Sequence, residues 1–317
     1  MESVRGTKAL DRTLVRPVLT IGNFDGLHLG HRSIMRIVIE RARALDGEAV
    51  VYTFDPHPRK VLQPDKAPPL LTSLDQKLEL LDEMGVDVVI VESFDADFAQ
   101  LPPETFVREY IHQRIGPREV YVGYDFHFGK DREGSMRMLT ETGPRLGFAV
   151  TIIPEVTVGG RDVNSSHIRD LVASGAVQEA GALLGRPFTM RGRIGRGARR
   201  GRTLGFPTAN LVAETEVIPR SGVYAGRLRF LDEGEPARGS IWPVVSNVGT
   251  RPTFQDGQGL VAEAHLIDFE GDCYDRQVEL GFEHLLRAEE RFPDVDALRA
   301  QIARDLDEAR RCLKTSV

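Results

Sequence analysis

Short apolar runs alternate with amphipathic stretches over the first 150 residues of the chain. Ile34, Met35, Val38 and Ala42 recur at helical spacing, which predicts a helix packed on a sheet over residues 31–45. Further helices are predicted at 74–84 and 103–115, and strands at 18–21, 50–54, 86–91, 119–122 and 149–153. This βα alternation predicts a mostly parallel sheet with helices on both faces. Ligands of such sheets bind beyond the carboxyl ends of the strands.

The periodicity changes near residues 183–187, where we expect a domain boundary. Apolar runs at 223–230, 241–245 and 263–269 follow one another without helices between them, which predicts a small antiparallel barrel. The chain closes with a predicted helix that Asp294 caps after Pro293. Its apolar stripe is expected to pack in the core and consists of Val295, Leu298, Ile302, Leu306, Ala309 and Leu313.

Composition narrows the class of protein. A length of 317 residues fits two domains, and a net charge of −6 argues against broad nucleic-acid binding while leaving small anionic substrates open. Cys273 and Cys312 form no CxxC motif, so neither a disulfide framework nor a structural zinc site is indicated, and a reducing cytoplasm is expected. The chain contains no apolar h-region at its start and no apolar run of about 18 residues, so no membrane span is expected.

The segment GNFDGLHLGH, residues 22–31, follows the first predicted strand and leads into the first helix. Gly22 and Gly26 permit a sharp turn, and His28 and His31 lie at the start of the helix. A helix N-terminus carries about half a positive charge and unpaired N–H groups, so it favours an anion such as phosphate. The spacing alone also allows a metal-binding pair or two surface histidines.

Two aromatic segments follow strands of the same predicted sheet. Phe54, Pro56 and Pro58 form a corner at the end of the second strand, where the prolines stop it. The segment 123–134 places Asp125, Phe126, His127 and Phe128 between glycines and basic residues. It fits a stacking platform for a planar ring and a packed loop with core phenylalanines equally well.

Two further segments are candidate phosphate sites. Ser165 and Ser166 begin a predicted helix with Arg169 one turn inside, an arrangement that suits either a helix cap or phosphate binding. Residues 191–205 carry six arginines within twelve residues, interleaved with glycines. A glycine-rich cover over nucleotide phosphates fits this pattern better than a nucleic-acid arm does. The segment is no Walker A loop, because the chain contains no GxxxxGK[ST].

Taken together and in this order, these motifs resemble those of the bifunctional prokaryotic riboflavin kinase/FMN adenylyltransferase family, also called FAD synthetase. The matching segments are GNFDGLHLGH (22–31), TFDPHP (53–58), GYDFHFGKDREG (123–134), NSSHIR (164–169), GRTLGFPTANL (201–211), GVYAG (222–226), SNVGTRPTF (246–254) and EAHLIDF (263–269). The resemblance implies an α/β plus β fold. A Rossmann-like nucleotidyltransferase domain would span residues 1–184, and a riboflavin kinase barrel with a terminal helix would span 185–317.

The resemblance implies two successive transfers with ATP, riboflavin and FMN as small-molecule partners, and with neither nucleic acid nor membrane. In the second domain the γ-phosphoryl group of ATP would pass to riboflavin, giving FMN. Glu263 would be the general base, and Thr208 and Asn210 would hold Mg²⁺ and the nucleotide phosphates, with Gly201 in the nucleotide site. Oxygen ligands of this kind suit Mg²⁺, which keeps several waters and is shared with substrate phosphates.

The first domain would then join FMN to the AMP part of a second ATP. The catalytic residues implied are His28 and His31. The nucleotide-binding residues implied are Gly22, Asn23, Phe24, Asp25, Gly26, Ser165, Ser166 and Arg169, and the flavin-binding residues are Phe54, Pro56, Pro58, Asp125, Phe126 and Phe128. A flavin-binding or sensing protein on the same scaffold, or an enzyme with one active domain, is the alternative.

Three residues depart from the family pattern. His127 replaces a common arginine, Ser166 replaces a threonine but keeps the hydroxyl, and Asp275 replaces a glycine. The last replacement leads us to expect an altered turn at that position.

Overall fold

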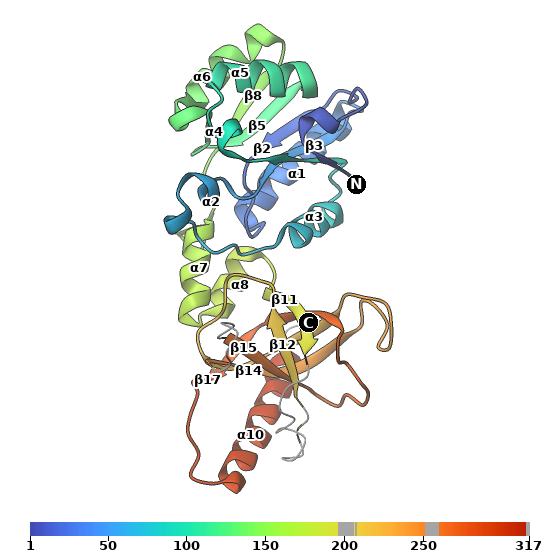
Figure 1. Cartoon of the computed structure of the whole chain (residues 1–317), viewed down its shortest axis with the longest axis vertical. Coiled ribbons are helices and arrows are strands. Elements are labelled where there is room, and N and C mark those ends of the chain that lie inside the picture. Colours follow the sequence, from blue (N-terminus) through green and yellow to red (C-terminus); the bar gives the residue numbers. More distant parts are fainter. Residues whose placement is uncertain (196–205, 207, 251–259, 315–317) are drawn as a thin grey trace. The chain divides into compact units, whose positions relative to one another are not determined.

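A computed structural model describes residues 1–195, 206, 208–250 and 260–314 of the chain (Figure 1). It divides into two units, Met1–Ser165 and Ser166–Val317. Among the residues so described, we find no helix that combines the length and the apolar character needed to cross a bilayer.

A sheet of six strands, all paired in parallel, forms the centre of the first unit. In sheet order the strands are β1 (Glu2–Arg5), β4 (Val88–Ser93), β3 (Ala49–Asp55), β2 (Val18–Ile21), β5 (Glu119–Gly123) and β8 (Ala149–Ile153). The predicted parallel sheet is therefore confirmed. The sequence pattern missed β1, because this strand is short, mostly polar and at the edge of the sheet.

Helices cover both faces of this sheet, as predicted (Figure 1). On one face α1 (Leu29–Ala44) and α3 (Leu74–Glu83) pack on alternate strand residues such as Val51 and Val89. On the other face η3 (Phe106–Ile115) and α6 (Met136–Thr142) pack on their neighbours, such as Val50 and Ile90. Burial on both faces explains why the strands are continuous apolar runs rather than alternating ones.

Shorter elements lie between these helices and strands along the first unit. They are η1 (Thr7–Ala9), α2 (Pro58–Leu62), η2 (Pro64–Lys66), α4 (Ala96–Ala99), α5 (Pro103–Thr105), β6 (His127–Phe128), η4 (Lys130–Arg132), β7 (Gly134–Ser135), η5 (Pro144–Leu146), β9 (Thr157–Val158) and β10 (Arg161–Asp162).

The strand order reverses beside β2. From β2 the chain continues to β3 and β4 on one side, and later returns to β5 on the other side of β2. In an open α/β sheet the carboxyl ends of strands at such a switch point form the ligand-binding crevice. The segment 22–31 begins directly at the end of β2, so the fold places it at this point.

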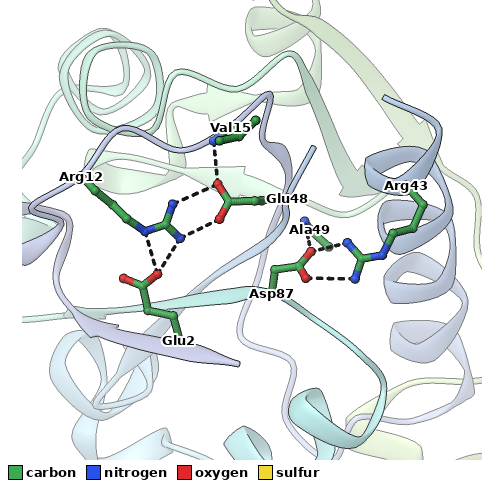
Figure 2. Close-up of polar contacts among 7 residues, drawn as sticks. All are labelled: Glu2, Arg12, Val15, Arg43, Glu48, Ala49 and Asp87. Atoms are coloured by element: carbon green, nitrogen blue, oxygen red, sulfur yellow. Dashed lines mark hydrogen bonds and ion pairs between the residues drawn. The ribbon is translucent and has the colours of Figure 1, made fainter. Parts of the chain in front are cut away.

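Ion pairs connect segments at the amino ends of the strands, which is the end of the sheet opposite the ligand-binding crevice (Figure 2). Arg12 bridges Glu2 and Glu48, with N–O distances of 2.6 Å to each, and the Glu48 carboxylate also accepts a bond from the Val15 amide. Glu48 immediately precedes β3. Its side chain is 19% exposed, and the hydrogen bond from Arg12 lowers its pKa from the ordinary value of 4.5.

We expect Glu48→Gln to lower the free energy of unfolding of the first unit by about 1–2 kcal/mol at pH 7, because a charge-assisted bond to Arg12 is lost. Since the pKa of Glu48 is lower in the folded protein, its stabilising contribution exists above pH 4.5 and disappears as the pH falls through the folded value. Urea unfolding at pH 7 and at pH 3 measures both effects. Glu40→Gln, at an exposed residue 4.0 Å from Arg36, is the matched control and should change little. Equal stability of Glu48→Gln and the parent at pH 7 would contradict this account.

The second unit contains an antiparallel barrel, as predicted. Six strands close it into a ring. Around the ring these are β11 (Phe188–Gly195), β12 (Ala209–Ala213), β15 (Leu260–Leu266), β14 (Ile241–Thr250), β13 (Gly222–Phe230) and β16 (Gln277–Phe282), which pairs again with β11. β17 (His284–Arg287) adds to β13. The helices α7 (Ser165–Ser174) and α8 (Val177–Leu184) precede the barrel in the chain.

The terminal helix α10 (Val295–Lys314) packs on the barrel through its later turns. Asp294 accepts a hydrogen bond from the Ala297 amide at 2.8 Å, which confirms the predicted cap. Leu306, Ala309 and Leu313 are buried against the barrel, with Ile302 at the edge of the cluster. The prediction was wrong for Val295, which is 52% exposed because the first turn precedes the part of the helix that contacts the barrel.

Asp275 has a left-handed backbone conformation, with φ of 62°. Aspartate is one of the few residues besides glycine that tolerates this region. The replacement of glycine at this position therefore does not prevent a left-handed turn.

Candidate active sites

The loop between β2 and α1 is tightly constrained. Phe24, Gly26 and Leu27 all have positive φ values, and a Cβ atom at Gly22 would lie 2.9 Å from the Phe24 ring. The buried Asp25 carboxylate accepts hydrogen bonds from the amides of Leu71 and Thr72 at 3.0 and 3.2 Å. The Gly26 amide donates to the Thr72 hydroxyl at 3.1 Å. Asp25 therefore fixes the loop by binding the segment that precedes α3.

The two histidines of this loop lie together at the N-terminus of α1. His28 is the N-cap, and its Nδ1 accepts a hydrogen bond from the His31 amide at 3.3 Å. The two rings stack with centroids 3.6 Å apart, and Phe24 contacts the His31 ring edge-on at 5.3 Å. Because Nδ1 of His28 accepts this bond, its Nε2 is the nitrogen that remains to donate.

His31 has an unusual electrostatic environment. Burial lowers its pKa well below the ordinary value of 6.5, and electrostatic interaction with His28 and Lys77 lowers it further. At neutral pH, His31 is therefore an uncharged imidazole that can donate one N–H. Its Nδ1 is buried and has no hydrogen-bond partner within the described part of the chain.

Lys77 of α3 lies beside this loop, and the sequence pattern did not single it out as a site residue. Its side chain is buried, and its Nζ donates to the Asn23 carbonyl oxygen at 2.7 Å and to the Thr53 hydroxyl at 3.5 Å. The available signal was its spacing, since Lys77 lies three residues after Leu74 and four before Leu81, on the apolar face of the predicted helix.

The serine-rich turn divides between the two units. The Ser165 hydroxyl donates to the Asp25 carbonyl oxygen at 3.0 Å, which joins this residue to the loop. Ser166 and Arg169 belong to the second unit and lie on α7.

The aromatic residues predicted to bind a ring differ in exposure. Phe54 is partly buried and packs edge-on against Tyr52 and Phe94, while Pro56 beside it is exposed and Pro58 begins α2. Phe126 is partly buried and stacks on Phe128 with centroids 5.5 Å apart. Phe128 is itself a core residue against Phe106, so the packed-loop interpretation holds for Phe128. Asp125 is exposed, and its carbonyl oxygen lies 2.8 Å from Nδ1 of His127.

In the barrel, strand register brings three polar side chains into one row. Glu263 of β15 pairs directly with Asn210 of β12 on one side and with Asn247 of β14 on the other. Directly paired residues point to the same face of a sheet, with Cβ atoms about 5 Å apart. Thr208, just before β12, is partly buried, whereas Gly201 lies outside the described residues.

Asn247 was not predicted as a site residue, although it belongs to the matching segment SNVGTRPTF. Its Nδ2 donates to Oε1 of Glu289 at 3.2 Å, which fixes the orientation of the amide. Its Oδ1 is then buried without a hydrogen-bond partner among the described residues. A Cβ at Gly249 would contact the Glu289 carboxylate, so a side chain there would displace Glu289 from its present position beside Asn247.

Neither site contains a preformed cluster of metal-binding side chains in the part of the chain that the structure describes, where no group of three or more His, Cys, Asp or Glu could hold a metal ion. Thr208 and Asn210 are neutral oxygen donors. Their chemistry fits Mg²⁺, which is commonly held by few protein ligands together with water and substrate phosphates.

Comparison with known proteins finds a matching family model for each half of the chain. A model of the FAD synthetase family matches residues 11–167, and a model of the riboflavin kinase family matches residues 184–313. The bifunctional riboflavin kinase/FMN adenylyltransferase of Escherichia coli is 40% identical over 288 residues, which cover 91% of this chain and 90% of that protein. The protein of the same description from Haemophilus influenzae is 37% identical over 310 residues, 98% of each chain. A crystal structure from Streptococcus pneumoniae, described as a macrolide-efflux protein, is similar with a TM-score of 0.87 and 28% identity over 98% of this chain and 99% of that chain. The chain therefore belongs to the bifunctional riboflavin kinase/FMN adenylyltransferase family.

Proposed function

We propose that this protein makes FAD from riboflavin in two steps, phosphorylation to FMN in the barrel and adenylylation of FMN in the parallel-sheet unit. Full-length similarity to the bifunctional relatives supports both activities. The observation that carries the proposal is the presence of two separate constellations, His28 with His31 at a helix N-terminus and Asn210–Glu263–Asn247 across three strands. We do not propose efflux, because both family models and these relatives name flavin chemistry.

For the kinase step, we assign Glu263 as the general base that accepts the proton of the riboflavin 5′-hydroxyl. Thr208 and Asn210 would hold Mg²⁺ and the ATP phosphates, and Gly201 would contribute to the nucleotide site. When bound, Mg²⁺ neutralises charge on the phosphates. Phosphoryl transfer depends mainly on positioning and charge neutralisation, so a rigid barrel wall is a suitable platform. Asn247, with its amide fixed by Glu289, presents an acceptor oxygen in the same row as Glu263.

For the adenylyl transfer, the FMN phosphate attacks the α-phosphorus of ATP, and pyrophosphate leaves. This reaction requires no nucleophile from the protein. It requires donors aimed at charge that develops on the phosphates. We assign this role to His28 and His31, with Gly22, Asn23, Phe24 and Gly26 shaping the loop that Asp25 anchors. Ser165, Ser166 and Arg169 are assigned to the departing pyrophosphate.

For the flavin ring of FMN, we propose a surface formed by Phe54, Pro56, Pro58, Asp125 and Phe126. Phe128 would act by supporting Phe126, on which it stacks. We further propose that the two functional domains span residues 1–184 and 185–317. A cytoplasmic location fits the cysteine content, since neither Cys273 nor Cys312 forms a disulfide.

One incubation tests the proposal. The protein is mixed with riboflavin, ATP and Mg²⁺, and the flavins are separated over time. FMN should appear first and FAD after it. Formation of FMN alone would restrict the protein to the kinase activity. A parallel incubation contains FMN in place of riboflavin, and FAD formed only there would restrict the protein to adenylylation. The absence of both products would contradict the enzymatic function and favour a flavin-binding protein.

A further inference from the structure

The most unusual charged group near the adenylylation loop is the ammonium of Lys77. Its residue is only 8% exposed, and Nζ lies 2.7 Å from the Asn23 carbonyl oxygen and 3.5 Å from the Thr53 hydroxyl. Asn23 belongs to the loop after β2, and Thr53 lies near the end of β3, the strand beside it. Lys77 thus connects the loop after β2 to the carboxyl end of β3.

Burying an ammonium is energetically unfavourable unless other groups compensate for its lost hydration. Burial lowers the pKa of Lys77, while the carboxylates of Asp25 and Asp55 favour its charged form. A neutral donor such as glutamine could bond to the Asn23 carbonyl without this cost. A lysine at this position therefore indicates that the charge itself has a role.

The histidine pair does not itself supply a fixed positive charge at the loop. His31 is uncharged at neutral pH because burial, together with electrostatic interaction with His28 and Lys77, lowers its pKa. The N-terminus of α1 supplies only about half an elementary charge. Charge also develops on the α-phosphate at this loop, apart from the pyrophosphate assigned to Ser165, Ser166 and Arg169. A fixed cation behind the loop would stabilise that developing charge.

We propose that Lys77 is a positioning residue for FMN adenylylation, whose buried ammonium holds the loop through the Asn23 carbonyl and supplies the fixed positive charge behind it. This inference rests on the proposed assignment of the His28–His31 loop to adenylyl transfer. Lys77 acts through the loop and through its field, and does not itself touch the reacting phosphorus. In a low-dielectric interior that field is stronger than the field of a surface lysine.

Three substitutions separate charge from hydrogen bonding. Lys77→Arg keeps the charge, Lys77→Gln keeps a donor without charge, and Lys77→Met removes both. We expect kcat for FMN adenylylation to fall at least tenfold in Lys77→Gln and Lys77→Met, with a smaller change in the KM for FMN. Lys77→Arg should retain more activity than either. Riboflavin phosphorylation by the same chains is an internal control for enzyme concentration, and the exposed Lys66→Gln is the matched control for loss of one charge.

The unfolding transition of each variant checks that the first unit remains folded. Lys77→Gln at the parental rate would overturn the proposal, because the charge would then be dispensable. Lys77→Arg with no more activity than Lys77→Met, in folded protein, would overturn it as well. His28→Ala, assayed in parallel, separates the two assignments. If His28→Ala loses FAD formation and Lys77→Gln does not, only the proposed role of Lys77 is wrong. If His28→Ala forms FAD at the parental rate, the assignment of the His28–His31 loop to adenylyl transfer is wrong.

Discussion

The Glu263→Gln variant is expected to lose riboflavin phosphorylation by about 10²–10⁴-fold, the usual contribution of a positioned general base. Its conversion of FMN to FAD should continue at the parental rate. Glutamine has almost the same shape as glutamate and can still lie between Asn210 and Asn247, but it cannot accept the proton of the ribityl hydroxyl. The variant therefore removes the chemistry and preserves the packing of the barrel wall.

Separate assays with riboflavin and with FMN measure the two steps in the same preparation. Glu270→Gln is a suitable control, since Glu270 is exposed and lies beyond the end of β15. If Glu263→Gln still formed FMN at the parental rate, Glu263 would not be the general base. Loss of both reactions in a folded variant would show that the two sites are not independent.

The His28→Ala variant is expected to accumulate FMN from riboflavin, because adenylylation should fall at least a hundredfold, equivalent to about 3 kcal/mol of transition-state stabilisation. The substitution removes a donor at the phosphates and also the ring on which His31 stacks. It removes the cap of α1 as well, which should cost about 1 kcal/mol of stability.

His28→Asn separates these effects, since asparagine is a good N-cap but lacks the imidazole. Both variants should accumulate FMN, whereas only His28→Ala should show the loss of stability in thermal unfolding. If His28→Asn restored FAD formation to the parental rate, the histidine would be acting as a cap and not as a phosphate donor. If His28→Ala itself formed FAD at that rate, the assignment of the loop would be wrong.

The sequence predicted most of the first unit because its signals are local. Continuous apolar runs identified five of the six strands of the sheet. The missing one, β1, is a short edge strand, and its pairing partner β4 is distant in the chain. Val295 satisfied the helical spacing of α10 but lies outside the contact with the barrel. Periodicity indicates which face of a helix is apolar, but not how far along its length a partner extends.

By itself the sequence determined the alternation of strands and helices, the change to a barrel in the second half, and the ordered motifs that identify the family, because each of these depends on residues close together in the chain. Only the tertiary structure decided what lies beside these motifs. The register of the closed barrel aligns Asn247 with Glu263, and the packing of α3 brings Lys77 to the Asn23 carbonyl, 54 residues away in the chain. Such neighbours depend on strand pairing and helix packing between distant segments, which no local spacing specifies.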